Sequence, residues 1–174
     1  LLAFAPFLAF ALVCHLVGAV PALAAGAIVS LALNVRDALT PGRSPKLLEI
    51  ATFVLFALLL CYALVAQPDW SLIEVRLMVD CGLLVIVLGS LLVGRPFTIQ
   101  YARERVPSEQ WGSPEFMRIN QRITGVWAGA FAVLVIADIA MLGAPQAHRF
   151  GVFLTIAALV VAVKLTDRLS GQDD

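Results

Sequence analysis

Three residues with acid–base side chains interrupt otherwise apolar stretches of the sequence: His15, Asp80 and Asp138. An imidazole and two carboxylates inside a membrane can relay a proton or bind a cation, so these residues form a candidate intramembrane polar cluster. The alternative is structural, with the three side chains forming hydrogen bonds between helices, or with Asp80 paired to Arg76 one turn earlier. We favour the structural interpretation.

The cysteines and the missing enzyme motifs argue against several other chemistries. Cys14, Cys61 and Cys81 are isolated thiols without Cys-x-x-Cys or Cys/His spacing, which predicts apolar packing rather than a disulfide framework or a metal site. The sequence lacks a phosphate-binding glycine loop and the His-Glu-x-x-His and Gly-x-Ser-x-Gly motifs. We therefore expect no catalytic residues, no cofactor and no metal, and predict that the protein is not an enzyme.

The composition indicates that the apolar stretches of the chain lie in lipid. Hydrophobic residues make up 61% of the 174 residues and charged residues only 14%. Because ~20 apolar residues in a helix cross the ~30 Å core of a bilayer, the chain is predicted to be an all-α transmembrane bundle, one domain over residues 1–174. A net charge of zero gives no case for nucleic acid. The expected partners are membrane lipids and other integral membrane proteins, with a homo-oligomer as an open alternative.

Breaks in the apolar pattern predict six spans. They are placed at residues 1–18, 21–39, 47–66, 71–94, about 114–142, and 149–167. The first two share one apolar run, which leaves five spans as the alternative, but a single helix of that length would be about twice as long as the bilayer is thick. The sequence Ser113-Pro114-Glu115 predicts the start of the fifth span, with an N-cap, a proline at N1 and an acid in the first turn. Trp70, in the turn at 67–70, suits an interfacial anchor.

The positive charges predict the orientation of the spans. With six spans and an inner N-terminus, ten basic residues fall on the inner side: Arg36, Arg43, Lys46, Arg95, Arg103, Arg105, Arg118, Arg122, Lys164 and Arg168. Only Arg76 and Arg149 fall outside, so the positive-inside rule places both termini in the cytoplasm. Merging the first two spans would keep the same loops inside and move the N-terminus out.

A second group of charged residues lies at the predicted inner ends of spans. They are Arg36, Asp37, Glu49, Lys164 and Asp167. We interpret them as side chains that reach the headgroups or pair at helix termini.

Small residues recur on two predicted helices and are candidates for helix packing. Ala22, Gly26 and Ser30 repeat every four positions, and Gly125 and Gly129 form a Gly-x-x-x-Gly motif. Such faces allow helix backbones to approach closely. The sequence does not say whether the partner helix belongs to the same chain.

A basic cytoplasmic connector is expected at about 95–113, where arginines alternate with apolar residues. The residues concerned are Arg95, Phe97, Ile99, Tyr101, Arg103, Arg105 and Trp111. They form a candidate contact with lipid headgroups or a partner, through a short helix in the headgroup plane with its aromatic residues toward lipid. The alternative is a plain connector bent at Pro96 and Pro107.

This connector also carries a family resemblance. The segment GRPFTIQYARERVP, followed by a tryptophan-containing loop and a helix beginning near RINQRITGVWAGAF, resembles the bacterial intracellular septation protein A family and its related small integral membrane proteins. The matching positions are Arg95-Pro96, Trp111, Asn120 and Trp127. The chain differs from the septation branch at FTIQYARERVP, where that branch has a Leu/Ile-rich, Lys-bearing helix. The resemblance implies a multi-pass inner-membrane protein of the cell envelope, linked to cell division, without an established enzymatic activity.

The sequence therefore predicts a non-catalytic protein of the bacterial cytoplasmic membrane that acts through other membrane proteins. One alternative is an accessory subunit of a larger energy-transducing or biosynthetic membrane complex. Another is a small proton-linked transporter or channel, for which dependence on Asp80 or Asp138 would be the distinguishing property.

Overall fold

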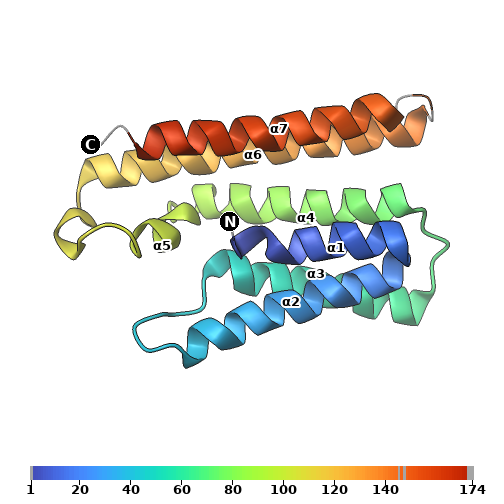
Figure 1. The fold of residues 1–174 in the computed structure, drawn as a ribbon, viewed down its shortest axis with the longest axis horizontal. Helices are drawn as coiled ribbons and strands as arrows, with labels where there is room; N and C mark the ends of the chain where they lie inside the picture. The colour runs from blue at the N-terminus through green and yellow to red at the C-terminus, as the bar shows by residue number, and fades with distance from the viewer. Residues whose placement is uncertain (1, 145, 147, 172–174) are drawn as a thin grey trace. The chain divides into compact units, whose positions relative to one another are not determined.

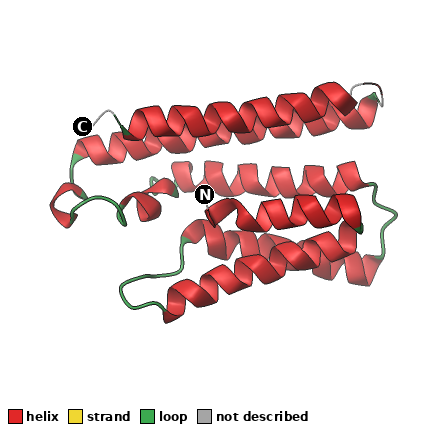
Figure 2. Ribbon diagram, viewed as in Figure 1, coloured by secondary structure: helices red, strands yellow, loops and turns green. Residues whose placement is uncertain are grey.

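The computed structural model describes residues 2–144, 146 and 148–171, and all regular secondary structure in this part of the chain is helical (Figures 1 and 2). The prediction of an all-α fold is confirmed. In chain order the elements are η1 (Leu2–Phe4), α1 (Ala5–Leu16), α2 (Ala19–Leu39), α3 (Leu47–Ala66), α4 (Leu72–Leu92), α5 (Thr98–Ala102), η2 (Ser108–Gln110), α6 (Pro114–Gly143) and α7 (His148–Ser170).

Five helices within the described residues are long and apolar enough to cross a membrane: α2, α3, α4, α6 and α7. Helix α1 is apolar but has only 12 residues, which is about 18 Å at 1.5 Å per residue and shorter than the ~30 Å hydrocarbon core. The structure therefore fits the alternative count of five full spans better than six. The same basic loops stay on the inner side under either count, so the inner C-terminus stays a prediction. Five crossings would place the N-terminus on the outer side, against the predicted inner location.

The continuous apolar run at the start of the chain forms two helices, as predicted, and Gly18 separates them. Its φ is +128° and its ψ is −179°, a backbone conformation open essentially only to glycine. Pro21 then lies in the first turn of α2, where its missing N–H breaks no intrahelical hydrogen bond. Gly18 alone therefore reverses the direction of the chain between α1 and α2.

Local capping explains where α4 and α6 begin. At the start of α4, the Ser71 N–H donates to Glu74 Oε2 at 2.7 Å and the Glu74 N–H donates to Ser71 Oγ at 3.2 Å, which forms a capping box. At the start of α6, Ser113 Oγ accepts from the Phe116 N–H at 3.1 Å. The predicted N-cap at Ser113 is confirmed, and α3 begins and ends where the sequence predicted, at Leu47 and Ala66.

The chain divides into two compact units, Leu1–Val79 and Asp80–Asp174, with the boundary inside α4. The core of the first unit surrounds the buried ring of Phe56, which lies 5.4 Å from the ring of Phe7 and 5.5 Å from that of Phe10, between centroids. Val75 and Val79, at the start of α4, join this core.

The second unit is built on the close approach of α6 and α7. A Cβ placed on Gly151 would lie 2.6 Å from the Met141 side chain. The absence of a side chain at Gly151 therefore allows the two helices to approach this closely. The rings of Trp127 and Phe131 add an aromatic pair with centroids 5.8 Å apart. Helix α5 is held to α6 by the Thr98 hydroxyl, which lies 3.0 Å from the Asn120 carbonyl oxygen and 2.9 Å from the Thr124 hydroxyl.

Candidate functional site

The two predicted intramembrane acids are buried in the second unit. Asp80 lies on α4 and Asp138 on α6, and the Asp138 side chain is fully excluded from solvent. These two acids are 58 positions apart in the sequence, counted from 80 to 138, and the structure buries both of them in the second unit.

The third member of the predicted cluster is placed differently. His15 lies near the end of α1 in the first unit, and its side chain is exposed. The three-residue cluster stays a prediction, and only the two acids have the burial that an interior relay requires.

A second group of charged residues surrounds Asp37 at the end of α2. The Asp37 carboxylate is fully buried, and its Oδ1 accepts from Arg36 Nε at 2.8 Å and from Arg36 Nη2 at 2.6 Å. Its Oδ2 accepts from Lys46 Nζ at 2.5 Å. Arg43 Nη1 lies 3.7 Å from Oδ1. Three cations therefore surround one buried carboxylate, which is how a buried charge is tolerated.

The Asp37 cluster extends into the α2–α3 interface. Lys46 Nζ lies 4.0 Å from Oε1 of the buried Glu49 side chain. The Asn34 amide donates to the Glu49 carbonyl oxygen at 3.0 Å and to the Ser30 carbonyl oxygen at 2.8 Å. These contacts tie the end of α2 to the start of α3 across the intervening loop.

Sequence reasoning did not identify the Asp37 cluster as a site. It treated the charged residues at the inner span ends alike, whereas the structure separates them. Arg36, Asp37 and Glu49 join one network with Arg43 and Lys46. Lys164 and Asp167, on α7, have exposed side chains. The available signal was the presence of three basic residues within ten positions of Asp37, joined by a short loop that turns α3 back against α2.

The two small-residue faces have different surroundings. Ala22, Gly26 and Ser30, here called the α2 small-residue face, are buried, and a Cβ on Gly26 would lie 2.6 Å from the Phe56 ring of α3. Gly125 and Gly129, here called the α6 small-residue face, are exposed, and a Cβ on either would meet no described atom within 4 Å. The first face is filled by the same chain and the second is open.

The connector contains a helix of only five residues, α5, and Phe97 at its start is buried. Phe97 is therefore not placed to insert into lipid or to touch a partner, because the protein interior already covers its ring. Arg95 and Arg105 are exposed, and Tyr101 is half-buried with its ring edge-on to Phe97 at 6.4 Å between centroids. The interfacial helix proposed for this segment thus lacks one of its two aromatic anchors.

Trp111 is fixed on the exposed side of the connector. The Arg103 guanidinium lies 5.3 Å from the centre of the Trp111 ring system, a cation–π arrangement. The indole N–H donates to the Val106 carbonyl oxygen at 2.9 Å. Arg103 and Trp111 together form an exposed pair, a guanidinium against an aromatic ring.

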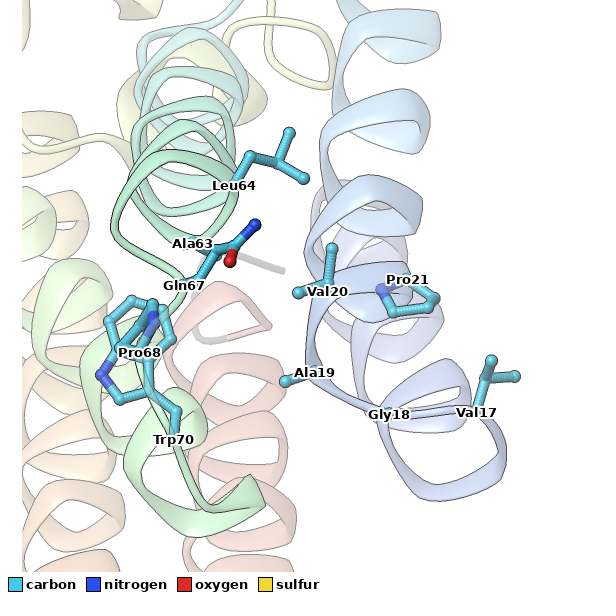
Figure 3. A pocket seen from close by; sticks show the side chains of 10 residues that line it. All are labelled: Val17, Gly18, Ala19, Val20, Pro21, Ala63, Leu64, Gln67, Pro68 and Trp70. Carbon is cyan, nitrogen blue, oxygen red and sulfur yellow. The ribbon is translucent and has the colours of Figure 1, made fainter.

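One hollow of about 480 Å³ lies in the first unit, between the α1–α2 turn and the end of α3 (Figure 3). Its lining consists of Val17, Gly18, Ala19, Val20, Pro21, Ala63, Leu64, Gln67, Pro68 and Trp70. Gln67 supplies an amide and Trp70 an indole N–H, but none of the lining residues carries an acid or a base. The hollow can therefore accommodate an apolar group and has no means of acid–base catalysis.

No group of three metal-ligating side chains is found among the described residues. The three cysteines are separate free thiols, with Cys14 buried, Cys61 exposed and Cys81 between these extremes. The described part of the chain therefore concentrates its polar chemistry in two places, the buried acids of the second unit and the Asp37 cluster of the first.

The five long apolar helices make this chain a multi-pass helical membrane protein. Comparison with protein-family models, with curated proteins and with solved structures gives no match.

Proposed function

We propose that the protein is a non-catalytic component of the bacterial cytoplasmic membrane that acts by binding another integral membrane protein through α6. The proposal keeps the envelope role implied by the resemblance of the connector to the septation protein A family. With such a contact, the protein would be an accessory subunit of a larger membrane complex.

The observation that carries the proposal is the open α6 small-residue face. Nothing in the described chain approaches Gly125 or Gly129 within van der Waals distance of a Cβ, whereas Gly26 and Gly151 are each covered by a side chain of a neighbouring helix. In lipid, helices associate through close packing and hydrogen bonds rather than through the hydrophobic effect, and small residues are what permits close packing. A partner helix with a similar flat surface could therefore approach α6 closely.

Purification of the tagged full-length protein in mild detergent, followed by native mass measurement and identification of co-purifying proteins, tests this function. We expect one partner at a fixed ratio, which the Gly125→Leu/Gly129→Leu variant loses. Gly89→Leu is the matched control, because Gly89 is also a glycine within a membrane helix with no atom near its Cβ position. A monomer without a partner would overturn the proposal, and a homodimer lost in the same variant would replace the partner with a second copy.

Proton-linked transport is the second candidate, and the burial of Asp80 and Asp138 favours it. Ionisable residues within spans are costly and commonly mark proton or ion pathways. Transport by the protein in liposomes, measured as proton flux down a pH gradient, would then fall strongly in Asp80→Asn and in Asp138→Asn. Asp69→Asn is the control, since Asp69 is exposed in the α3–α4 turn. Flux equal to that of empty liposomes would reject this candidate.

A further inference from the structure

The Asp37 cluster carries more positive charge than its carboxylates balance. Its cations are Arg36, Arg43 and Lys46, and its carboxylates are Asp37 and Glu49. With all five groups ionised, the cluster has one unit of excess positive charge.

The excess charge lies on the open side of the cluster. Both carboxylates are buried, with side-chain exposures of 0% and 2%, and so is Lys46 at 4%. The two arginines are the exposed members, Arg36 at 35% and Arg43 at 44%. A molecule that approaches the cluster therefore meets guanidinium groups, with the acids behind them.

The two guanidiniums converge and keep donors to spare. Both contact the same oxygen, Asp37 Oδ1, so they lie within a few ångströms of each other. Arg36 uses Nε and Nη2 on that oxygen, which leaves Nη1. The 3.7 Å separation of Arg43 exceeds hydrogen-bond length, and the Arg43 guanidinium donates to no residue in the described part of the chain. Asp37 is the anion that both guanidiniums share, and because Lys46 also pairs with it, its single negative charge offsets their mutual repulsion only in part.

We propose that Arg36 and Arg43 form a binding site for a phosphate oxyanion, with the buried Asp37 as the residue that positions both guanidiniums. Arginine is suited to phosphate because its planar donors match two oxygens at once. The site lies where candidate span α2 ends and candidate span α3 begins. That position is level with lipid headgroups, so the phosphodiester of an anionic phospholipid is the source that the geometry favours over free phosphate.

Lipid binding to the purified full-length protein, counted by native mass spectrometry, tests the site. The probe is phosphatidylglycerol, titrated against protein in a neutral detergent, with phosphatidylcholine as the neutral comparison. We expect Arg36→Gln/Arg43→Gln to weaken phosphatidylglycerol binding about tenfold or more and to leave phosphatidylcholine unchanged. Arg118→Gln/Arg122→Gln removes the same charge from two exposed arginines on α6 and should change binding less than twofold.

Two further measurements keep the test decisive. Arg43→Gln alone removes no hydrogen bond of the fold, so it reports on binding even if the double variant is unstable, and it should weaken phosphatidylglycerol binding severalfold. Inorganic phosphate added as a competitor separates the two sources of the ligand: displacement of the lipid at millimolar phosphate would assign the site to a soluble anion, and resistance assigns it to the headgroup. Equal binding by the Arg43→Gln, Arg36→Gln/Arg43→Gln and Arg118→Gln/Arg122→Gln variants would overturn the proposal.

Discussion

The α2 and α6 small-residue faces share one sequence pattern and have opposite surroundings. On α2, Gly26 is in contact with the Phe56 ring, and on α6, Gly125 and Gly129 face open space. The difference shows that spacing of small residues specifies a surface that can be approached closely but not what approaches it. Whether the surface is filled depends on a large side chain on the facing helix, and Phe56 is that side chain for α2.

The most damaging change to this arrangement removes the ring that fills the α2 face. Phe56→Ala should lower the free energy of unfolding by about 3–5 kcal/mol, because it leaves a cavity between Gly26, Phe7 and Phe10. The measurement is loss of helical circular dichroism as sodium dodecyl sulfate is titrated into mild-detergent micelles. Phe153→Ala, an exposed phenylalanine on α7, is the control and should leave the midpoint almost unchanged. Equal shifts for the two variants would mean that Phe56 is not a core residue.

The next change fills the α2 face instead of emptying it. Gly26→Leu should cost about 1–3 kcal/mol of stability, since the new side chain overlaps a ring that is itself fixed by two others. Gly125→Leu should cost nothing and can gain up to about 1 kcal/mol, because leucine is the better helix former and meets no atom. The same titration compares the two. Similar destabilisation at both positions would remove the distinction between a filled and an open face.

The smallest expected effect concerns the hydroxyl on the α2 face. Ser30 Oγ donates to the Gly26 carbonyl oxygen at 2.7 Å and to the Ala27 carbonyl oxygen at 3.1 Å, both within its own helix. Ser30→Ala should therefore change stability by only about 0.5–1 kcal/mol, in contrast to the loss expected from Phe56→Ala. Thermal denaturation in detergent resolves this difference, and a loss comparable with that of Gly26→Leu would show that the hydroxyl links two helices.

The sequence was sufficient to predict the helices because their limits depend on local signals. Gly18 and Ser113 act on their immediate neighbours. Gly18 separates the first two helices and Ser113 begins α6, both as predicted. The length of α1 was harder to predict, because apolarity alone does not distinguish a helix that crosses the bilayer from a shorter one.

The sites were less predictable because they depend on side chains brought together by tertiary structure. The burial of Phe97 requires knowing that α5 turns back onto α6 through Thr98. The Asp37 cluster requires the register between α2 and α3, which places Lys46 against Asp37. Periodicity specifies which residues share a face, and it contains no information on the register between two helices.

The backbone of Gly18 has a further consequence for the chemistry of the α1–α2 turn. When the signs of φ and ψ at Gly18 are inverted, the angles are those of an ordinary extended L-residue. A D-amino acid has the mirror-image preferences, so it favours the angles that Gly18 adopts. Handedness rather than size restricts this position, because a Cβ there would meet no neighbouring atom. In a chemically synthesised chain, D-alanine would fit at residue 18 where L-alanine would not, and glycine is the one encoded residue that has no handedness to conflict with the turn.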